Sequence, residues 1–235
     1  MDQSVLFLSL QQLPVLKALT SDELNRLAQN TIYKKFSKNS LLYQVGETCS
    51  YVYLIEKGSV KLGALAASGK MLTKEIIYDK EIFGENVFST HPLTREYAET
   101  MTETKVFMIP VDIFKSIVME NSVFAAEIMN IILAKLQNIE ERLQSFVFRR
   151  AKERIVDFIY RTGLRKGIKI GFKECLIDHG MSHKEIAFLT DTSRQTVARI
   201  MNELKRENYI HYGSRKSSKI LIRDMVLLKE FNMAV

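Results

Sequence analysis

Short runs of alternating apolar and polar residues fill the first half of the chain, between about residues 32 and 110. In "SYVYLIEKGSVKLGAL", apolar residues recur two positions apart on both sides of Lys57-Gly58, which is the spacing of strands joined by a tight turn. The residues at this spacing are Val52, Leu54, Val60 and Leu62. The stretches "KMLTKEIIYDKEIFGE" and "TKVFMIP" continue in the same manner. Such a series of short strands predicts a β-sandwich or barrel of the jelly-roll kind.

Turn and helix signals accompany these strands. Glycine accepts a positive φ without steric cost, and four glycines lie where turns are needed. They are Gly46, Gly58, Gly63 and Gly69. Ahead of the strands, "LTSDELNRLAQN" carries Thr20 and Glu23 at the spacing of a capping box, so an amphipathic helical turn or two is expected there.

Residues 111–148 have the pattern of one long helix with an early break. In its later part, apolar residues recur at alternating spacings of three and four, the a and d pattern of a coiled-coil seam, with charges such as Glu140 and Arg142 beside it. The seam residues are Met129, Ile132, Leu136, Ile139, Leu143 and Phe146. The seam could pack on the chain's own β-domain. That domain would leave a single long helix half uncovered, so we expect the seam to form the interface of a homodimer.

The remaining residues, 149–235, have a mixed pattern. "RAKERIVDFIYRTG" predicts an amphipathic helix that Gly163 closes, and "KIGFKECLI" fits short strands or a loop. Two helical patterns separated by a tight turn follow in "SHKEIAFLTDTSRQTVARIMNELKREN". "YIHYGSRKSSKILI" then predicts a hairpin, after which Asp224 is expected to cap a last short helix.

The two helices around the tight turn have the features of a helix-turn-helix. Ser182 and Glu185 form a second capping box, which sets the start of the first helix. Ala187 is small enough to let the second helix cross closely, and Asp191 occupies the turn position where glycine is commonest. In this motif the second helix enters the major groove of DNA. Four apolar residues anchor that helix: Val197, Ile200, Met201 and Leu204.

Three polar side chains near the start of the second helix are expected to point away from the core. Arg194 and Arg199 can pair with guanine O6 and N7, and Gln195 can pair with adenine N6 and N7. Hydroxyls near helix N-termini and basic side chains in the hairpin suit phosphates. Basic residues can also simply solvate a helix, so the motif is weighed together with the charge of its segment. The candidate DNA contacts are Ser182, His183, Ser193, Arg194, Gln195, Thr196, Arg199 and Lys216, with Arg215 and Lys219 beside the last in the hairpin.

Charge is distributed unevenly along the 235 residues, whose formal net charge is +7. Residues 1–147 hold 15 basic and 17 acidic side chains, a balance of −2, whereas residues 148–235 hold 19 and 10, a balance of +9. A near-neutral domain is therefore joined to one that meets a polyanion. Charge alone does not separate DNA from RNA, an acidic protein or an anionic membrane. The helix-turn-helix on the basic segment favours double-stranded DNA.

Composition indicates a folded, soluble chain, with 46% hydrophobic and 26% charged residues. No run approaches the ~20 apolar residues of a membrane span, and the N-terminus lacks the basic region and cleavage site of a secretion signal. Cys49 and Cys175 lack metal-ligand spacing and are expected as free thiols in a reducing cytoplasm.

From about Leu13 to Phe231 the chain resembles the Crp/Fnr family of transcription regulators. The resemblance rests on "YQVGETCSYVYLIEKGSVKL", "IFGE", "AKERI" and "MSHKEIAFLTDTSRQTVARIMNELKRENYI". It implies an α+β fold in three parts. It also implies a regulator that binds an inverted repeat of DNA as a homodimer, with RNA polymerase as a candidate partner. The parts are a cyclic-nucleotide-binding-like jelly roll (1–110), a dimerisation helix (111–148) and a winged helix-turn-helix (149–235).

The family's recognition helix reads bases through an Arg, a Glu and a second Arg. By resemblance these positions are Arg194, Gln195 and Arg199, so Gln replaces the family's Glu. A carboxylate accepts from cytosine N4, whereas Gln favours adenine, and the base preference at this one position is expected to change.

The resemblance also indicates where a small-molecule effector would bind in the jelly roll. The family's cAMP receptors hold the ring phosphate with a Gly-Glu pair and an Arg-Ser pair. This chain keeps the first pair, but Glu96 follows the arginine, and an acidic side chain beside a phosphate opposes binding. We therefore expect no cAMP, and the pocket could take another small molecule or none. The effector-site candidates are Gly84, Glu85, Arg95, Tyr97 and Ile139.

Other classes of protein fit these residues less well. A cyclic-nucleotide-sensing module that regulates a protein partner would share the jelly roll but has no use for the Arg-Gln-Arg helix. An iron–sulfur sensor needs more than two cysteines, and a haem site would rest on His91 alone. A metal-dependent enzyme on a jelly roll needs clustered ligands, and residues 1–147 contain one histidine. With no phosphate loop or nucleophile motif elsewhere, we expect neither a metal nor catalysis.

Overall fold

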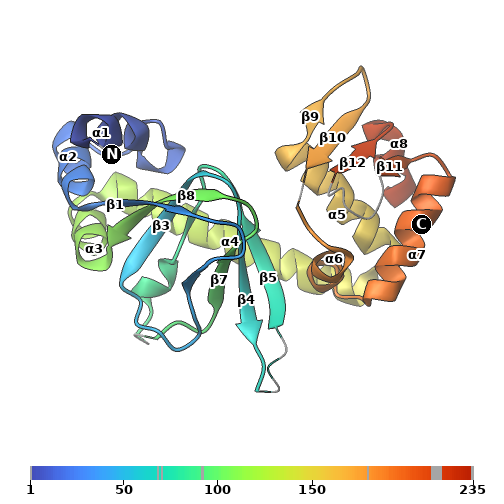
Figure 1. Cartoon of the computed structure of the whole chain (residues 1–235), viewed down its shortest axis with the longest axis horizontal. Coiled ribbons are helices and arrows are strands. Elements are labelled where there is room, and N and C mark those ends of the chain that lie inside the picture. Colours follow the sequence, from blue (N-terminus) through green and yellow to red (C-terminus); the bar gives the residue numbers. More distant parts are fainter. Residues whose placement is uncertain are drawn as a thin grey trace. The chain divides into compact units, whose positions relative to one another are not determined.

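The computed structural model describes residues 2–67, 69, 71–90, 93–178, 180–212 and 219–233 (Figure 1). It divides into two compact units, Met1–Asn138 and Ile139–Val235, with the boundary inside one long helix. Arg215, Lys216 and His91 lie outside the described residues.

The first unit opens with helices that cover one face of a sheet. They are α1 (Gln3–Gln11), the 3₁₀ turn η1 (Pro14–Leu16) and α2 (Ser21–Asn30). The predicted capping box at the start of α2 is confirmed: the Glu23 N–H donates to Thr20 Oγ1 over 3.3 Å, and the Thr20 N–H donates to Glu23 Oε2 over 2.8 Å. Each side chain satisfies a backbone donor that the helix leaves unpaired.

Two four-stranded antiparallel sheets follow, as the alternating pattern predicts. The first has the order β1-β8-β3-β6: Ile32–Phe36, Thr104–Pro110, Tyr51–Lys57 and Ile82–Phe83. The second has the order β2-β7-β4-β5: Leu41–Tyr43, Tyr97–Thr100, Val60–Leu65 and Met71–Ile77. The 3₁₀ turn η2 (Glu85–Phe88) lies between β6 and β7 in sequence. The predicted jelly roll is therefore confirmed as a two-sheet β-domain.

Strand β3 is buried on both faces, which explains its nearly continuous apolar sequence. Val52 and Leu54 pack in the cluster that contains the N-terminal helices, whereas Tyr53 and Ile55 pack in a second cluster with Val60, contributed by the other sheet. Alternate side chains of a strand point to opposite faces, so β3 joins the two apolar clusters of the first unit.

Three of the four predicted turn glycines have positive φ: Gly46 at 88°, Gly58 at 110° and Gly69 at 77°. The prediction is wrong for Gly63, which lies inside β4 and pairs with Tyr97 of β7. A Cβ at this position would lie 2.4 Å from the Tyr97 ring and 2.3 Å from the Leu72 carbonyl oxygen. Gly63 is therefore required by a close approach in the sheet, and not by a turn.

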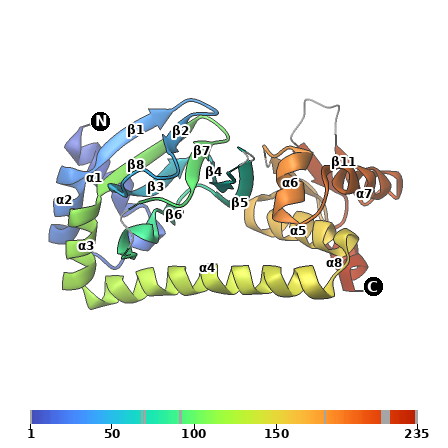
Figure 2. The same ribbon diagram turned by 90° about the horizontal axis from the view of Figure 1, so that it is seen from below.

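The predicted long helix has its early break at Asn121. Helix α3 (Val111–Glu120) ends there and α4 (Ser122–Phe148) begins; Figure 2 shows α4 as one uninterrupted helix. The Asn121 side chain accepts from the Phe124 N–H over 2.9 Å and donates to the Ala18 carbonyl over 3.1 Å. It thereby caps α4 and ties the break to the N-terminal helices.

Taken singly, none of the described helices is long and apolar enough to cross a bilayer. Helices α3 and α4 meet that criterion only when they are counted together across the 114° bend between them.

The second unit combines helices with a four-stranded antiparallel sheet of order β11-β12-β10-β9. The predicted hairpin and last helix are confirmed, and the Asp224 carboxylate accepts from the backbone N–H groups of Val226 and Leu227 at 2.8 and 3.1 Å. The elements are α5 (Ala151–Lys166), β9 (Ile168–Lys169), β10 (Cys175–Asp178), α6 (His183–Leu189), α7 (Arg194–Arg206), β11 (Ile210–Tyr212), β12 (Lys219–Ile222) and α8 (Met225–Met233).

The prediction that Gly163 ends its helix is wrong, because α5 continues to Lys166. A Cβ on Gly163 would lie 3.0 Å from Ile222 Cδ1 and 3.2 Å from Met225 Sδ. The glycine therefore allows β12 and α8 to pack closely on α5.

Candidate DNA-binding interface and sensor pocket

Helices α6 and α7 and the four-residue turn between them form the predicted helix-turn-helix. At the start of α6, the Glu185 N–H donates to Ser182 Oγ over 3.3 Å and the Ser182 N–H donates to Glu185 Oε2 over 2.7 Å. The turn places Asp191 at φ 50°, the left-handed conformation expected for it. Ala187 is buried against the neighbouring helix, since α6 and α7 pack on each other.

Helix α7 has one buried and one exposed face, as its spacing predicts. Val197, Ile200, Met201 and Leu204 are buried in the second unit. Arg194, Gln195 and Arg199 are exposed, and the Arg199 side chain reaches 70% exposure. The first two turns of α7 therefore present two guanidinium groups and an amide to solvent, an arrangement suited to reading base edges in a major groove.

The start of α7 is capped by Ser193, whose Oγ accepts from the Thr196 N–H over 3.0 Å. The two hydroxyls lie 2.8 Å apart, so one donates to the other. Ser193 is exposed, and the helix N-terminus beside it favours an anion such as a DNA phosphate.

His183 lies half-buried at the first position of α6. Burial, followed by the nearby positive charge of Arg194, lowers the pKa of the His183 imidazole below its ordinary value. The ring meets Tyr212 of β11 edge-on, with centroids 6.5 Å apart. His183 is consequently a neutral donor or acceptor at neutral pH, rather than a cation for phosphate.

Three contacts that the sequence did not suggest hold α7 in place. Lys152 of α5 donates to Glu203 of α7 over 2.5 Å, and this bond lowers the pKa of the Glu203 carboxyl. On the other side, the Tyr212 hydroxyl donates to Asn202 Oδ1 over 2.5 Å, and Lys205 donates to the Tyr212 carbonyl over 3.1 Å. The partners in these three contacts are 7 to 51 residues apart in the chain, so local periodicity in the sequence could not predict the contacts.

The predicted seam forms an exposed apolar stripe on α4. Met129, Leu136, Ile139, Leu143 and Phe146 are between 50 and 65% exposed, as are neighbouring apolar side chains such as Val147. The exception is Ile132, which packs against the core of the first unit. An exposed stripe of this size on one helix is typical of an interaction surface.

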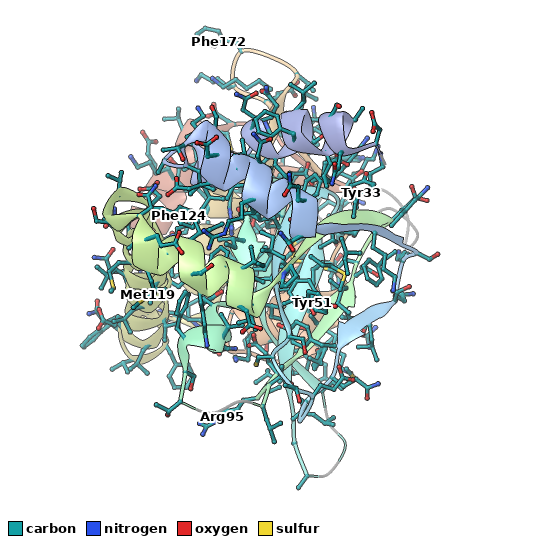
Figure 3. The ribbon with its side chains drawn as sticks, turned by 90° about the vertical axis from the view of Figure 1, so that its left-hand side faces the viewer. Tyr33, Tyr51, Arg95, Met119, Phe124 and Phe172 are labelled. Atoms are coloured by element: carbon teal, nitrogen blue, oxygen red, sulfur yellow. The ribbon has the colours of Figure 1, made fainter. Side chains whose placement is uncertain are left out.

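The effector candidates lie in different surroundings. Gly84 takes φ 94° at the start of η2, and the Glu85 carboxylate accepts from Lys135 of α4 over 2.6 Å. Arg95 is exposed, and Figure 3 shows it at the edge of the β-domain. Tyr97 is buried in β7 against Gly63, and Ile139 is 65% exposed on α4. The exposed guanidinium and the buried phenol therefore face different environments.

The residue after Arg95 points inward instead. Glu96 is 7% exposed, and its carboxylate accepts from Lys74 at 2.8 Å, Asn86 at 3.2 Å and Tyr43 at 3.3 Å. The Glu96 carboxylate thus lies in the interior of the β-domain next to η2, where it already accepts three hydrogen bonds. A phosphate at this place would meet an anion and would need to displace those donors.

Cys49 is half-buried and Cys175 buried, and both are free thiols. Burial is the main cause that raises the pKa of each thiol, which keeps it protonated at neutral pH. Within the described part of the chain, no group of three or more His, Cys, Asp or Glu side chains could hold a metal ion.

Two family models match the chain. The cyclic nucleotide-binding domain covers residues 33–121, and the Crp-like helix-turn-helix domain covers residues 153–231. Among similar proteins, the anaerobic regulatory protein of Bacillus subtilis is 23% identical over 205 residues, 87% of this chain and 85% of that protein. The CRP-like cAMP-activated global transcriptional regulator of Mycobacterium tuberculosis is 23% identical over 190 residues, 80% and 83% of the two chains.

Solved structures share the fold. FixK2 from Bradyrhizobium japonicum aligns with a TM-score of 0.74 at 18% identity, over 85% of this chain and 96% of that one. A CooA mutant from Carboxydothermus hydrogenoformans aligns with a TM-score of 0.69 at 24% identity, over 87% and 88%.

Proposed function

Because the chain belongs to the Crp/Fnr family of transcription regulators, we propose that it binds an inverted-repeat DNA operator as a homodimer. The observation that carries the proposal is the exposed face of α7, on which Arg194, Gln195 and Arg199 stand opposite a fully buried apolar face. The function is gene regulation in the cytoplasm, and not catalysis.

Each exposed side chain of α7 has a base-edge partner of matching chemistry. Arg194 and Arg199 donate bidentately to guanine, and the Gln195 amide both donates to and accepts from adenine. The hydroxyls of Ser182, Ser193 and Thr196, with Lys216 from the sequence between β11 and β12, contact phosphates and fix the register of the helix on the duplex. The balance of +9 in residues 148–235 supports this phosphate attraction.

Dimerisation through the α4 seam accounts for the exposed apolar stripe. Pairing two copies of Leu136, Ile139, Leu143 and Phe146 removes those side chains from water. A two-fold dimer presents two copies of α7, which read half-sites about 34 Å apart on one face of the duplex. RNA polymerase is a further partner in keeping with the family.

The β-domain is the place for a small-molecule effector. The Mycobacterium relative is named as cAMP-activated, but the inward carboxylate of Glu96 and the outward side chain of Arg95 disfavour a cyclic nucleotide phosphate in this chain. The protein would have two states that differ in the arrangement of the DNA-binding helices. An effector bound in the β-domain would act by binding one of these states more tightly than the other.

In vitro selection from a randomised duplex pool tests the proposal, with purified full-length protein and no added ligand. We expect the wild-type protein to select an inverted repeat. In parallel selections with Arg194→Ala or Arg199→Ala, we expect each variant to lose its base preference at one position of each half-site. Affinity should fall steeply with salt, because each neutralised phosphate contributes about −0.9 to the slope of log K against log salt on B-DNA.

A regulatory module that acts on a protein partner remains the alternative function. It predicts recovery of no sequence and a shallow salt dependence, and that combination would reject DNA binding as the function.

A further inference from the structure

The turn between α6 and α7 is held by two arginines from outside the helix-turn-helix. Arg142 of α4 contacts the Asp191 carboxylate with two nitrogens, Nε at 2.9 Å and Nη2 at 2.7 Å, and Nη2 also donates to the Phe188 carbonyl over 2.5 Å. Arg154 of α5 donates to the carbonyls of Thr190 and Asp191 at 2.8 and 2.9 Å. Guanidinium groups thus satisfy three carbonyl acceptors at and just after the C-terminal end of α6, those of Phe188, Thr190 and Asp191. The helix dipole favours positive charge there.

Asp191 has a conformation that glycine would adopt at lower cost. Its φ is 50°, and the Thr192 N–H donates to the Ala187 carbonyl over 2.9 Å, the long-range bond of a Schellman turn. A residue with a side chain has a strained backbone at this position of the turn. Such strain persists where interactions of the side chain compensate for it. Here the carboxylate forms a bidentate ion pair with Arg142, in which the two side chains are 33% and 29% exposed. Because the contact is bidentate, it fixes the relative orientation of the two side chains as well as bringing opposite charges together.

Both arginines also lie beside the α4 seam. Arg142 immediately precedes the seam residue Leu143, and the Arg154 guanidinium lies 5.4 Å from the ring centroid of the seam residue Phe146. Arg154 also donates to the Arg149 carbonyl over 2.5 Å, in the segment that joins α4 to α5. The α6–α7 turn is therefore connected to the part of α4 that the proposed dimer would fix.

We propose that Arg142, Asp191 and Arg154 form a clamp that sets the orientation of α7 relative to the dimer seam, and so determines the half-site spacing that the protein accepts. The inference rests on the proposed function, since spacing has meaning only for a dimer on two half-sites. These are positioning residues: α7 begins three residues after Asp191, and none of the three needs to touch DNA.

The test measures binding of full-length protein to duplexes that carry the selected half-sites at the preferred separation and at separations one and two base pairs longer or shorter. A duplex with one half-site is measured as well. Asp191→Gly removes the carboxylate while a glycine keeps the turn at positive φ. Arg142→Gln removes the guanidinium. Glu141→Gln is the matched control, because its exposed ion pair with Arg161 also joins α4 to α5 and involves no residue of the helix-turn-helix.

We expect Asp191→Gly and Arg142→Gln each to reduce the preference for the best separation by about tenfold, with single half-site affinity unchanged. The double variant should be no worse than Arg142→Gln alone, since Arg142→Gln already removes the contact with Asp191 together with the bond to the Phe188 carbonyl. Glu141→Gln should keep the wild-type profile. Unchanged spacing profiles in both single variants, or additive losses in the double variant, would overturn the clamp.

The outcome is separable from that of the proposed function. Wild-type protein that prefers no inverted repeat contradicts the proposed function itself, whereas a wild-type preference that survives both substitutions contradicts only the clamp. Should Asp191→Gly fold poorly, Arg142→Lys decides instead: it keeps the charge but loses the bidentate geometry, and the clamp requires a loss of spacing preference there too.

Discussion

Gln195 stands where the resemblance to the Crp/Fnr family places a Glu in the recognition helix. Its side chain is exposed on the first turn of α7, between the two arginines that flank it on the same face. A Gln amide both donates and accepts, and so matches adenine, whereas a Glu carboxylate only accepts and matches the cytosine amino group. In the proposed function, the difference would concern one base pair in each half-site.

We expect Gln195→Glu to change the selected base at one symmetric position of the operator and to leave the other positions intact. Discrimination at that position should be about 1–3 kcal/mol in each protein, toward different bases. Parallel selections with the two proteins measure it. Identical selected sequences would mean that Gln195 does not read a base.

His183 gives the second unit a pH dependence whose sign follows from its surroundings. Its pKa is lowered in the folded chain, so the unfolded chain binds the proton at a higher pH, near 6.5. Stability should therefore decline as pH falls from about 6.5 toward the folded pKa, and level off below it.

His183→Gln removes this decline. Thermal unfolding between about pH 5 and 8 measures the effect, with His211→Gln as a comparison that removes an exposed histidine from the same unit. A pH profile for His183→Gln that still declines below 6.5 in the wild-type manner would contradict the assignment.

At the level of elements, the sequence predicted most where local spacing decides the structure. The period of two in 52–62, the two capping boxes and the stripe of α7 all depend on residues within a few positions of one another. Gly63 and Gly163 could not be predicted in this way, because the atoms that exclude a Cβ belong to Tyr97 and Ile222, far along the chain. The same reason applies to the bonds of Lys135 and Arg142, whose partners lie 50 and 49 residues away.

The seam on α4 supplies the prediction for this scale. Leu136 is 50% exposed at a central seam position, and a dimer would bury it against the second copy. Leu136→Glu would place unpaired charges in that interface, a cost of several kcal/mol. We expect a monomer by light scattering and the loss of tight binding to the inverted repeat.

Ala134→Glu is the matched control, since Ala134 is exposed on α4 two positions from Leu136, off the seam. It should remain dimeric and bind normally. A dimeric Leu136→Glu variant with normal operator affinity would show that the seam is not the dimer interface.

For the whole molecule, the two parts of the chain differ in net charge. The near-neutral residues 1–147 contain the β-domain, whose carboxylates Glu85 and Glu96 each accept from a lysine of the same unit. The basic residues 148–235 contain the helix-turn-helix. An effector that binds the first part and changes DNA affinity must bias the second, and linkage then requires DNA to change effector affinity by the same factor.

This reciprocity makes cAMP a decisive ligand to test. With Glu96 inward and Arg95 outward, a cyclic phosphate would approach a carboxylate without an arginine to neutralise it. We expect no heat of binding in calorimetry up to about 1 mM cAMP, a limit that corresponds to less than about 4 kcal/mol of binding free energy. Operator affinity should likewise be the same with and without the nucleotide. Micromolar cAMP binding with no effect on DNA would indicate a site uncoupled from α7. Micromolar binding that raises operator affinity would contradict this expectation and would indicate a cAMP site coupled to α7.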